Sequence, residues 1–180
     1  MNNVQKDYQI NKQTMALMTA FQIEYETVVI ERKRRLYIRK PPLELIKKGC
    51  LNGGSSYDGR RSAVTYLTGS MKKVPIPISP ENNIIAFPTC APDSLSCHWI
   101  FYQHIFDIMS APKKEKLAAQ SIIVFHNGFK LPMEESSHIL NKQYNRAAIA
   151  DIKLSSYMKT AQELAPDYTF DPPDELTPPS

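Results

Sequence analysis

The first forty residues alternate between short apolar runs and polar breaks, a pattern that is typical of β-strands. Residues 13–21 and 27–30 are rich in residue types that strands tolerate, and residues 35–39 alternate charged and apolar positions. We therefore expect three strands here, with the basic run Arg32–Arg35 at the turn between the last two.

Two short helices are expected next. Pro42 suits the first helical position, and Gly49 follows a pair of lysines that suits a helix end. After a glycine-rich loop, Asp58 is the expected N-cap of a second helix, which runs to about Leu67 and stops at Gly69.

The second half of the chain begins with extended segments. Residues 84–87 predict a buried strand, and residues 98–109 predict a long aromatic strand. An Asn-Gly pair separates residues 122–126 from residues 129–133, and this pair is the strongest short hairpin signal in the chain.

From residue 137 to residue 163 apolar positions recur at steps of three and four, which predicts a helix. Strands first and a long helix last indicate an α+β fold. We expect mostly antiparallel strands and hairpins, short helices, a longer C-terminal helix and a disordered acidic tail.

The division into domains follows length and charge. A chain of 180 residues suits one ordinary domain, which we place at residues 1–162. Residues 163–180 carry 5 acidic and no basic residues and are rich in proline, so we expect a flexible tail there. Residues 31–73 carry 12 basic and 3 acidic residues, and this asymmetry favours a polyanionic partner.

Composition excludes several classes of protein. An apolar share of 42% excludes wholesale disorder, and no apolar run is long enough to cross a membrane. The N-terminus lacks the features of a secretory signal peptide, and the odd number of 3 cysteines is unlike a secreted disulfide framework. We therefore expect a cytoplasmic protein with reduced thiols and no cofactor.

Basic residues cluster in four runs and are the first candidates for a binding surface. Such cations displace counterions from a nucleic-acid backbone, and arginines enter narrow minor grooves. Ordinary solvated surface charge explains the same pattern about equally well.

The Gly-Ser loop before the second helix is a second candidate, because backbone N–H groups there could hold a phosphate, although a plain turn explains it equally well. The candidate DNA-contacting residues are Arg32, Lys33, Arg34, Arg35, Arg39, Lys47, Lys48, Ser55, Ser56, Tyr57, Arg60, Arg61, Lys72 and Lys73.

Cysteine and histidine residues suggest an alternative, a zinc-containing module or enzyme. Cys90, Cys97, His98 and His104 lie within 15 residues, but their spacing is poor for a zinc site, and buried thiols and core histidines are the better explanation. No known catalytic motif is present, so we expect no enzymatic activity and assign no catalytic or metal-binding residue.

Aromatic residues suggest another alternative, an RNA or single-stranded nucleic-acid-binding protein. Trp99, Phe101, Tyr102 and Phe106 are spaced closely enough to stack on bases. Aromatic residues are more often part of a core, however, and we expect these side chains to be mainly buried.

Several segments together resemble the ComK family, the competence transcription factors of low-GC Gram-positive bacteria. The resembling segments lie between about Tyr8 and Ile152, and the chain after about Lys153 departs from the family pattern. The segments are Gly54-Ser55-Ser56-Tyr57-Asp58-Gly59-Arg60, Ile84-Ile85-Ala86-Phe87-Pro88-Thr89, Cys97-His98-Trp99-Ile100 with His104, Asn127-Gly128 and Gln143-Tyr144-Asn145-Arg146-Ala147.

The resemblance implies a DNA-binding activator of competence genes, which serve DNA uptake. It implies binding to double-stranded AT-rich boxes mainly through the minor groove, self-association as dimers that combine in pairs on DNA, and no cofactor. RNA polymerase and an adaptor for a Clp protease are further implied partners. The basic block suits such a target, since AT-rich tracts have a narrow and electronegative minor groove.

Overall fold

The computed structural model describes residues 4–113 and 118–164, and its largest element is a seven-stranded sheet. The strand order is β1-β4-β3-β2-β7-β6-β5, with β1 parallel to β4 and all other neighbours antiparallel. Pairing of β2 with β7 joins two antiparallel three-stranded units. The strands are β1 (Val4–Gln5), β2 (Thr14–Thr19), β3 (Thr27–Glu31), β4 (Arg35–Ile38), β5 (Ile76–Ser79), β6 (Ile84–Pro88) and β7 (Trp99–Phe101).

A second, antiparallel sheet has the order β10-β9-β8 and follows the first directly in the chain. Its strands are β8 (Ile105–Ser110), β9 (Ser121–Phe125) and β10 (Lys130–Met133). The single long strand predicted for residues 98–109 is wrong. A 3-10 turn, η2 (Tyr102–His104), divides it, because β7 pairs in the first sheet and β8 in the second. The hairpin predicted at the Asn-Gly pair is confirmed, with Gly128 at a φ of 83°.

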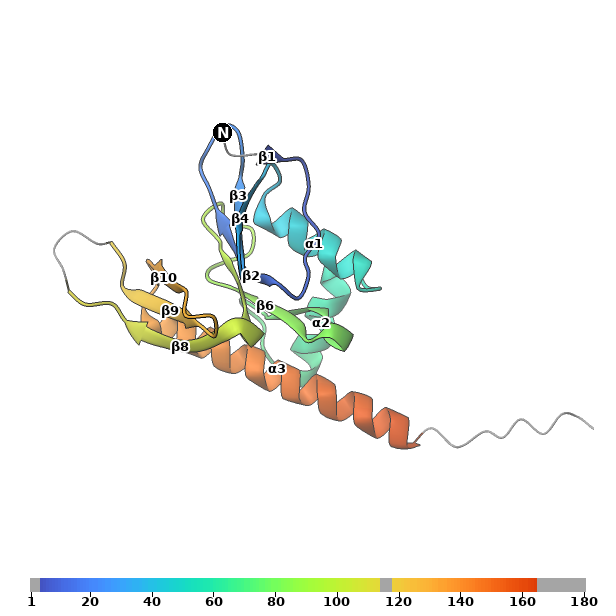
Figure 1. The fold of residues 1–180 in the computed structure, drawn as a ribbon. Helices are drawn as coiled ribbons and strands as arrows, with labels where there is room; N and C mark the ends of the chain where they lie inside the picture. The colour runs from blue at the N-terminus through green and yellow to red at the C-terminus, as the bar shows by residue number, and fades with distance from the viewer. Residues whose placement is uncertain (1–3, 114–117, 165–180) are drawn as a thin grey trace, which may run out of the picture.

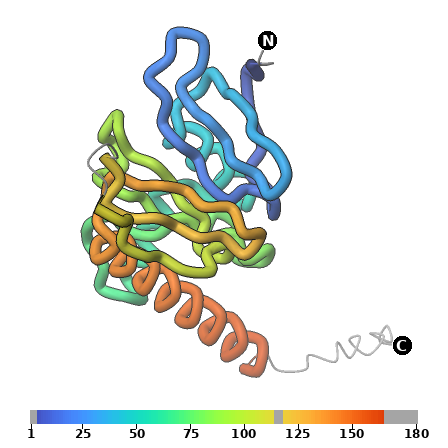
Figure 2. Tube along the Cα trace, turned by 60° about the vertical axis from the view of Figure 1, so that its left-hand side comes forward, coloured from blue at the N-terminus to red at the C-terminus, as the bar shows by residue number. Residues whose placement is uncertain are grey.

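Among the described residues, three α-helices pack around the two sheets, and a second 3-10 turn, η1 (Pro80–Asn82), links β5 to β6. The helices are α1 (Pro42–Asn52), α2 (Tyr57–Thr68) and α3 (Ser137–Leu164). Helix α3 contacts β6, β8 and α2, and its last turns project away from the rest of the molecule (Figures 1 and 2).

The two faces of the large sheet bury different cores, since successive strand residues point to opposite faces. On one face Trp99 belongs to the same buried cluster as Leu45 of α1. On the other face Phe87 clusters with Ile123 of the second sheet and Leu140 of α3. Helix α1 and the second sheet with α3 therefore cover opposite faces of the large sheet (Figure 1).

The first helix continues past its predicted end. Gly49 lies inside α1, and the helix ends at Asn52 with Gly53 as its C-cap. A Cβ atom at Gly49 would lie 3.0 Å from side-chain atoms of both Ile10 and Ile78. Glycine at this position therefore serves close packing, and its identification as a helix stop is wrong.

The second helix begins two residues earlier than predicted and ends as expected. Ser56 is the N-cap, and its hydroxyl accepts a hydrogen bond from the Gly59 N–H at 3.0 Å. The prediction of Asp58 as the cap is wrong, because Asp58 already belongs to the first helical turn. Gly69 closes the helix in the left-handed conformation with a φ of 73°, as predicted.

The α+β prediction is confirmed, with mainly antiparallel strands and a long C-terminal helix. The predicted tail at residues 163–180 begins inside α3, which extends to Leu164, and residues 165–180 lie outside the described residues. In the part of the chain that the structure describes, no helix is both long and apolar enough to cross a membrane.

Candidate nucleic-acid interface

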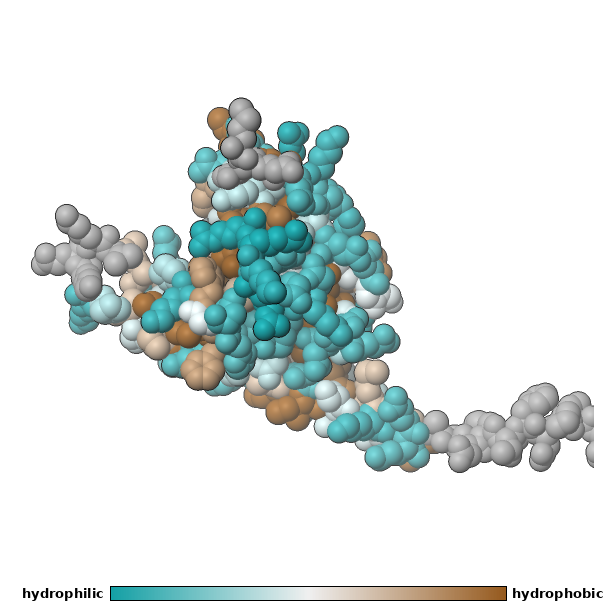
Figure 3. All heavy atoms as spheres, in the orientation of Figure 1, coloured by the Kyte–Doolittle hydropathy of each residue, from teal (hydrophilic) through white to brown (hydrophobic). Residues whose placement is uncertain are grey.

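The turn between β3 and β4 and the first residue of β4 present four successive basic side chains, Arg32–Arg35, and we call these residues the basic turn. All four residues are exposed. The turn closes with a hydrogen bond from the Glu31 N–H to the Arg34 carbonyl at 3.0 Å. In the view of Figure 3, strongly hydrophilic side chains gather over β2 and β4 near the centre of the face.

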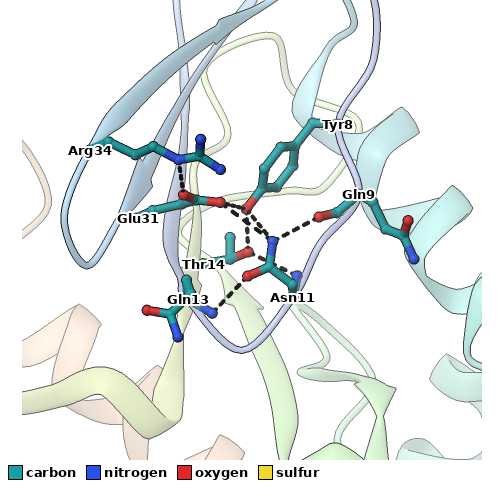
Figure 4. Close-up of polar contacts among 7 residues, drawn as sticks. All are labelled: Tyr8, Gln9, Asn11, Gln13, Thr14, Glu31 and Arg34. Atoms are coloured by element: carbon teal, nitrogen blue, oxygen red, sulfur yellow. Dashed lines mark hydrogen bonds and ion pairs between the residues drawn. The ribbon is translucent and has the colours of Figure 1, made fainter.

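A buried carboxylate lies directly beneath the basic turn (Figure 4). The Glu31 side chain is only 5% exposed, and its Oε2 accepts a hydrogen bond from the Arg34 Nε at 2.5 Å. Its Oε1 accepts one from the Tyr8 hydroxyl at 2.8 Å, and the Asn11 amide approaches the same oxygen at 3.4 Å. The Tyr8 oxygen also lies 2.6 Å from the hydroxyl of Thr14. Glu31 of β3 therefore fixes the orientation of Arg34. Residues of β2 and of the chain before β2 fix Tyr8 and Glu31 in turn.

Ionisation of this cluster follows from its contacts. Burial opposes the charge on Glu31, but hydrogen bonds from Arg34, Tyr8 and Asn11 outweigh burial and lower the pKa of the carboxyl below its ordinary value. Burial raises the pKa of Tyr8, and the adjacent Glu31 carboxylate raises it further. At neutral pH the cluster thus holds a charged glutamate and a neutral tyrosine.

A second turn, between β9 and β10, lies against the basic turn. The Asn127 side-chain N–H donates to the Arg32 carbonyl at 2.9 Å, and the Arg35 guanidinium lies 5.4 Å from the centre of the Phe129 ring. Residues of both turns line a shallow hollow of about 250 Å³. The β9–β10 hairpin of the second sheet comes up beside the strands of the first in Figure 2.

Sequence reasoning did not place these neighbours of the basic turn. Asn127 was identified only as a hairpin residue, and Phe129 only as part of a strand. His104 also lies close enough for the Arg32 charge to lower its pKa, although burial is the larger cause. No local signal links these residues to the basic turn, because they are at least 69 positions away in the sequence.

Other predicted basic residues lie around helix α1, and several already have partners within the chain. Lys48 forms an ion pair with Asp7, and Lys47 lies 6.0 Å from the centre of the Tyr57 ring. Arg39 follows β4, at the end opposite the basic turn. The structure therefore does not bring these cations together with the basic turn on one small surface.

The Gly-Ser loop uses most of its backbone donors within the chain. The N–H groups of Gly53, Gly54 and Ser55 bond to carbonyls of α1, at distances of 3.0 to 3.1 Å. The Arg60 guanidinium bonds to the Gly53 carbonyl at 2.5 Å. A Cβ atom at Gly53 would lie 2.3 Å from the Ile78 carbonyl oxygen, so this glycine allows the loop to approach β5. These contacts favour the plain-turn interpretation of the loop.

The remaining candidates contact or belong to the segment that follows α2. Arg61 donates to the Met71 carbonyl at 3.2 Å. The carbonyls of Lys72 and Lys73 accept hydrogen bonds from Arg146 and Gln143 of α3 at 3.1 and 2.9 Å. Backbone contacts thus connect this segment to α3, whereas the basic turn contacts the second sheet.

The aromatic residues divide between core and surface. Trp99 and Phe101 are fully buried, as expected for core residues. Phe106 is 69% exposed, contrary to that expectation, and its ring centre lies 5.7 Å from that of His126. Phe106 lies in β8 at a register shift between Ile105 and Asp107, and it is not part of the buried cluster that includes Ile105 and Ile108.

The cysteines and histidines occupy separate environments. Burial raises the pKa of Cys97 to about 12 and that of Cys50 to about 11. Nδ1 of His98 accepts a hydrogen bond from the Thr19 N–H at 3.0 Å, and burial lowers its pKa. Within residues 4–113 and 118–164, no three His, Cys, Asp or Glu side chains are grouped to hold a metal ion.

Comparison with known proteins identifies relatives of this sequence. The sequence matches the family model of the ComK protein over residues 5–159, which extends beyond the resemblance predicted to end near Ile152. The competence transcription factor of Bacillus subtilis strain 168 is 24% identical over 174 residues, which is 96% of this chain and 88% of that protein. No solved structure matches significantly. The family match includes both sheets, the basic turn and most of α3, and the chain therefore belongs to the ComK family of competence transcription factors.

Proposed function

We propose that this chain activates competence genes by binding AT-rich duplex DNA, with the basic turn as its main contact. One observation supports the proposal most directly. Arg32–Arg35 are all exposed, and Arg34 among them is paired with the buried carboxylate of Glu31. A narrow hairpin tip with several arginines suits an AT-rich minor groove, where the negative potential is enhanced. The proposal includes a cytoplasmic location, since the chromosome lies there.

The contacts of each cation suggest a different role. Arg32 and Lys33 have exposed side chains and supply mobile charge for phosphates or the groove. Arg34 remains 64% exposed although it is paired with Glu31, so it presents a guanidinium in a fixed orientation. Arg35 lies over Phe129 and joins the two turns.

Self-association on paired boxes is part of the proposal and has its own test. Sedimentation of the protein with a duplex that carries one box or two measures how many copies bind. We expect more copies on the two-box duplex than on the one-box duplex, with a higher affinity per box. RNA polymerase and a protease adaptor remain predicted partners.

Fluorescence anisotropy on three labelled ligands tests the nucleic-acid preference. The ligands are a duplex with spaced A-run and T-run boxes, a GC-rich duplex of equal length and a single strand. We expect tightest binding to the boxed duplex, a preference that persists as salt rises, and displacement by netropsin, which fills the AT minor groove. Equal and steeply salt-dependent binding to all three ligands would overturn sequence preference and leave a general polyanion surface.

Single-strand binding is a second candidate because Phe106 is exposed beside His126. An exposed ring can stack on a base, which contributes about 1–3 kcal/mol. The variant Phe106→Ala separates the two functions. A single-strand binder loses affinity for the single strand, whereas the duplex reader keeps its affinity for the boxed duplex.

A further inference from the structure

An apolar hollow of about 280 Å³ lies at the end of the β2–β4 unit opposite the basic turn. It is formed by the loop after β2, the start of α1 and the loop before β7, and we call it the apolar hollow. Its apolar lining includes Phe21, Leu43, Leu95 and Trp99. The length of β3, roughly 15 Å, separates it from the basic turn.

Large apolar side chains stand exposed around this hollow. Phe21 is 73% exposed, Leu95 is 83% exposed, and the neighbouring Ile23 is fully exposed. Soluble proteins rarely leave several large apolar residues together on the surface unless a partner covers them. The lining and its rim therefore have the character of a binding surface for an apolar group.

Trp99 lines the hollow and has a buried side-chain donor without a partner among the described residues. Trp99 is fully buried, and within the described residues its Nε1 atom has no hydrogen-bond partner. Buried indole N–H groups are normally paired, because an unpaired donor loses its hydration without compensation. Because Trp99 lines the hollow, its indole should sense what fills the hollow.

The charge at the rim indicates what kind of molecule fits. Glu26 and Asp93 line the hollow, and its described lining contains no lysine or arginine. Neither carboxylate forms an ion pair within the described residues, although Arg39 lines an adjacent hollow with Glu26. Carboxylates repel nucleic acid and anionic lipid and attract Lys or Arg.

We propose that the apolar hollow receives a short segment of a partner protein in which one large apolar side chain is flanked by Lys or Arg. The apolar side chain packs against Phe21 and Leu95, and the flanking cations face Glu26 and Asp93. Because the hollow and the basic turn lie at opposite ends of the same strands, the partner and nucleic acid can bind together. This inference does not depend on the proposed DNA preference.

Tryptophan fluorescence provides a direct test, since Trp99 is the single tryptophan of the chain. The probe is the capped peptide Lys-Ala-Phe-Ala-Lys, which contains no tryptophan, and its charge-reversed control is Glu-Ala-Phe-Ala-Glu. We expect a saturable change in Trp99 emission with the first peptide and binding at least tenfold weaker with the second. No saturable change at millimolar peptide, or equal binding of both peptides, would overturn the proposal.

Two variants locate the effect on the surface. Leu95→Ser should weaken binding of the basic peptide at least tenfold, whereas Leu51→Ser, at another exposed position, on α1, should not change it. Asp93→Asn should reduce the difference in affinity between the basic peptide and its charge-reversed control. Peptide affinity unaffected by Leu95→Ser would contradict the location. If zwitterionic lipid vesicles change Trp99 emission saturably and the peptide does not, the occupant is lipid and the proposal is wrong.

Anisotropy with the boxed duplex keeps the two proposals distinguishable. Leu95→Ser should retain the wild-type affinity for DNA, and saturation with DNA should leave peptide affinity unchanged. Loss of DNA affinity in Leu95→Ser would instead place the hollow within the DNA-binding surface and contradict its separate role.

Discussion

The buried Glu31 carboxylate determines how the basic turn orients its Arg34 side chain. Glu31 accepts hydrogen bonds from Arg34 and Tyr8, and its side chain is only 5% exposed. Removing one partner from such a cluster leaves the others buried without compensation, which is costly. The Glu31 carboxylate thus stabilises the fold and also positions the Arg34 side chain.

Glu31→Gln should lower the free energy of unfolding by about 1–3 kcal/mol at neutral pH. Urea denaturation measures it, with Glu44→Gln as the control, because Glu44 forms a half-exposed ion pair with Lys40. The same stability in both variants would contradict the argument.

The pH dependence of this effect has a definite sign. The pKa of Glu31 is lower in the folded chain than its ordinary value. Its contribution is therefore complete above the ordinary pKa of a glutamate and is lost as pH falls through the lowered pKa of the folded state. The stability difference between wild type and Glu31→Gln should shrink over that acidic range, and a constant difference would show that the charge of Glu31 is not involved.

Thiol reactivity should differ among the three cysteines. Cys50 and Cys97 are buried with raised pKa values, so their reactive thiolates are rare at neutral pH. Cys90 is only partly buried and should react first with iodoacetamide. Mass spectrometry of peptides after brief labelling measures the order. Equal labelling of Cys90 and Cys97 in the native protein would contradict it.

At the scale of elements, the loop between α1 and α2 depends on one close backbone approach. Gly53→Ala places a methyl group 2.3 Å from the Ile78 carbonyl and should destabilise the protein by about 1–3 kcal/mol. Asn52→Ala, an exposed neighbour at the helix end, should change stability by less than about 0.5 kcal/mol. Thermal unfolding of the two variants measures the difference, and equal melting temperatures would show that the loop can move away from β5.

Elements were predictable wherever the local sequence determines the conformation. Gly69 ends α2 because it adopts a left-handed conformation, and the Asn-Gly pair forms the β9–β10 turn for a related reason. Gly49 misled the prediction because its small size serves packing against Ile10 and Ile78, contacts that local sequence does not contain. Residues 98–109 were misinterpreted for the same reason, since the division between β7 and β8 depends on pairing with distant strands.

At the scale of the whole molecule, the salt dependence of DNA binding should identify the contacting cations. Each lost phosphate contact lowers the slope of log K against log salt by roughly one. The double variant Arg32→Ala/Lys33→Ala should therefore lower the slope by about two. The control Lys142→Ala/Lys159→Ala removes two exposed charges from α3 and should leave the slope unchanged. Equal slopes in the two double variants would mean that only net charge matters.

The candidate surface was only partly predictable, because contacts between distant residues are not contained in the local sequence. The sequence shows every cation, and the basic turn follows from its position between two strand patterns. It does not show that Asn127 bonds to Arg32, because that contact depends on how the second sheet packs against the first. It also does not show that Lys48 is paired with Asp7.

The pairing of β2 with β7 also has a consequence for synthesis of the chain. Ala16 and Leu17 pair with Ile100 and Trp99, residues that the ribosome adds much later. At typical bacterial rates the nascent N-terminal hairpins wait several seconds with one edge of β2 unpaired. An unpaired strand edge is a template for association with other chains. Translation rate and chaperone supply should therefore limit the yield of this protein more than the stability of its finished fold does.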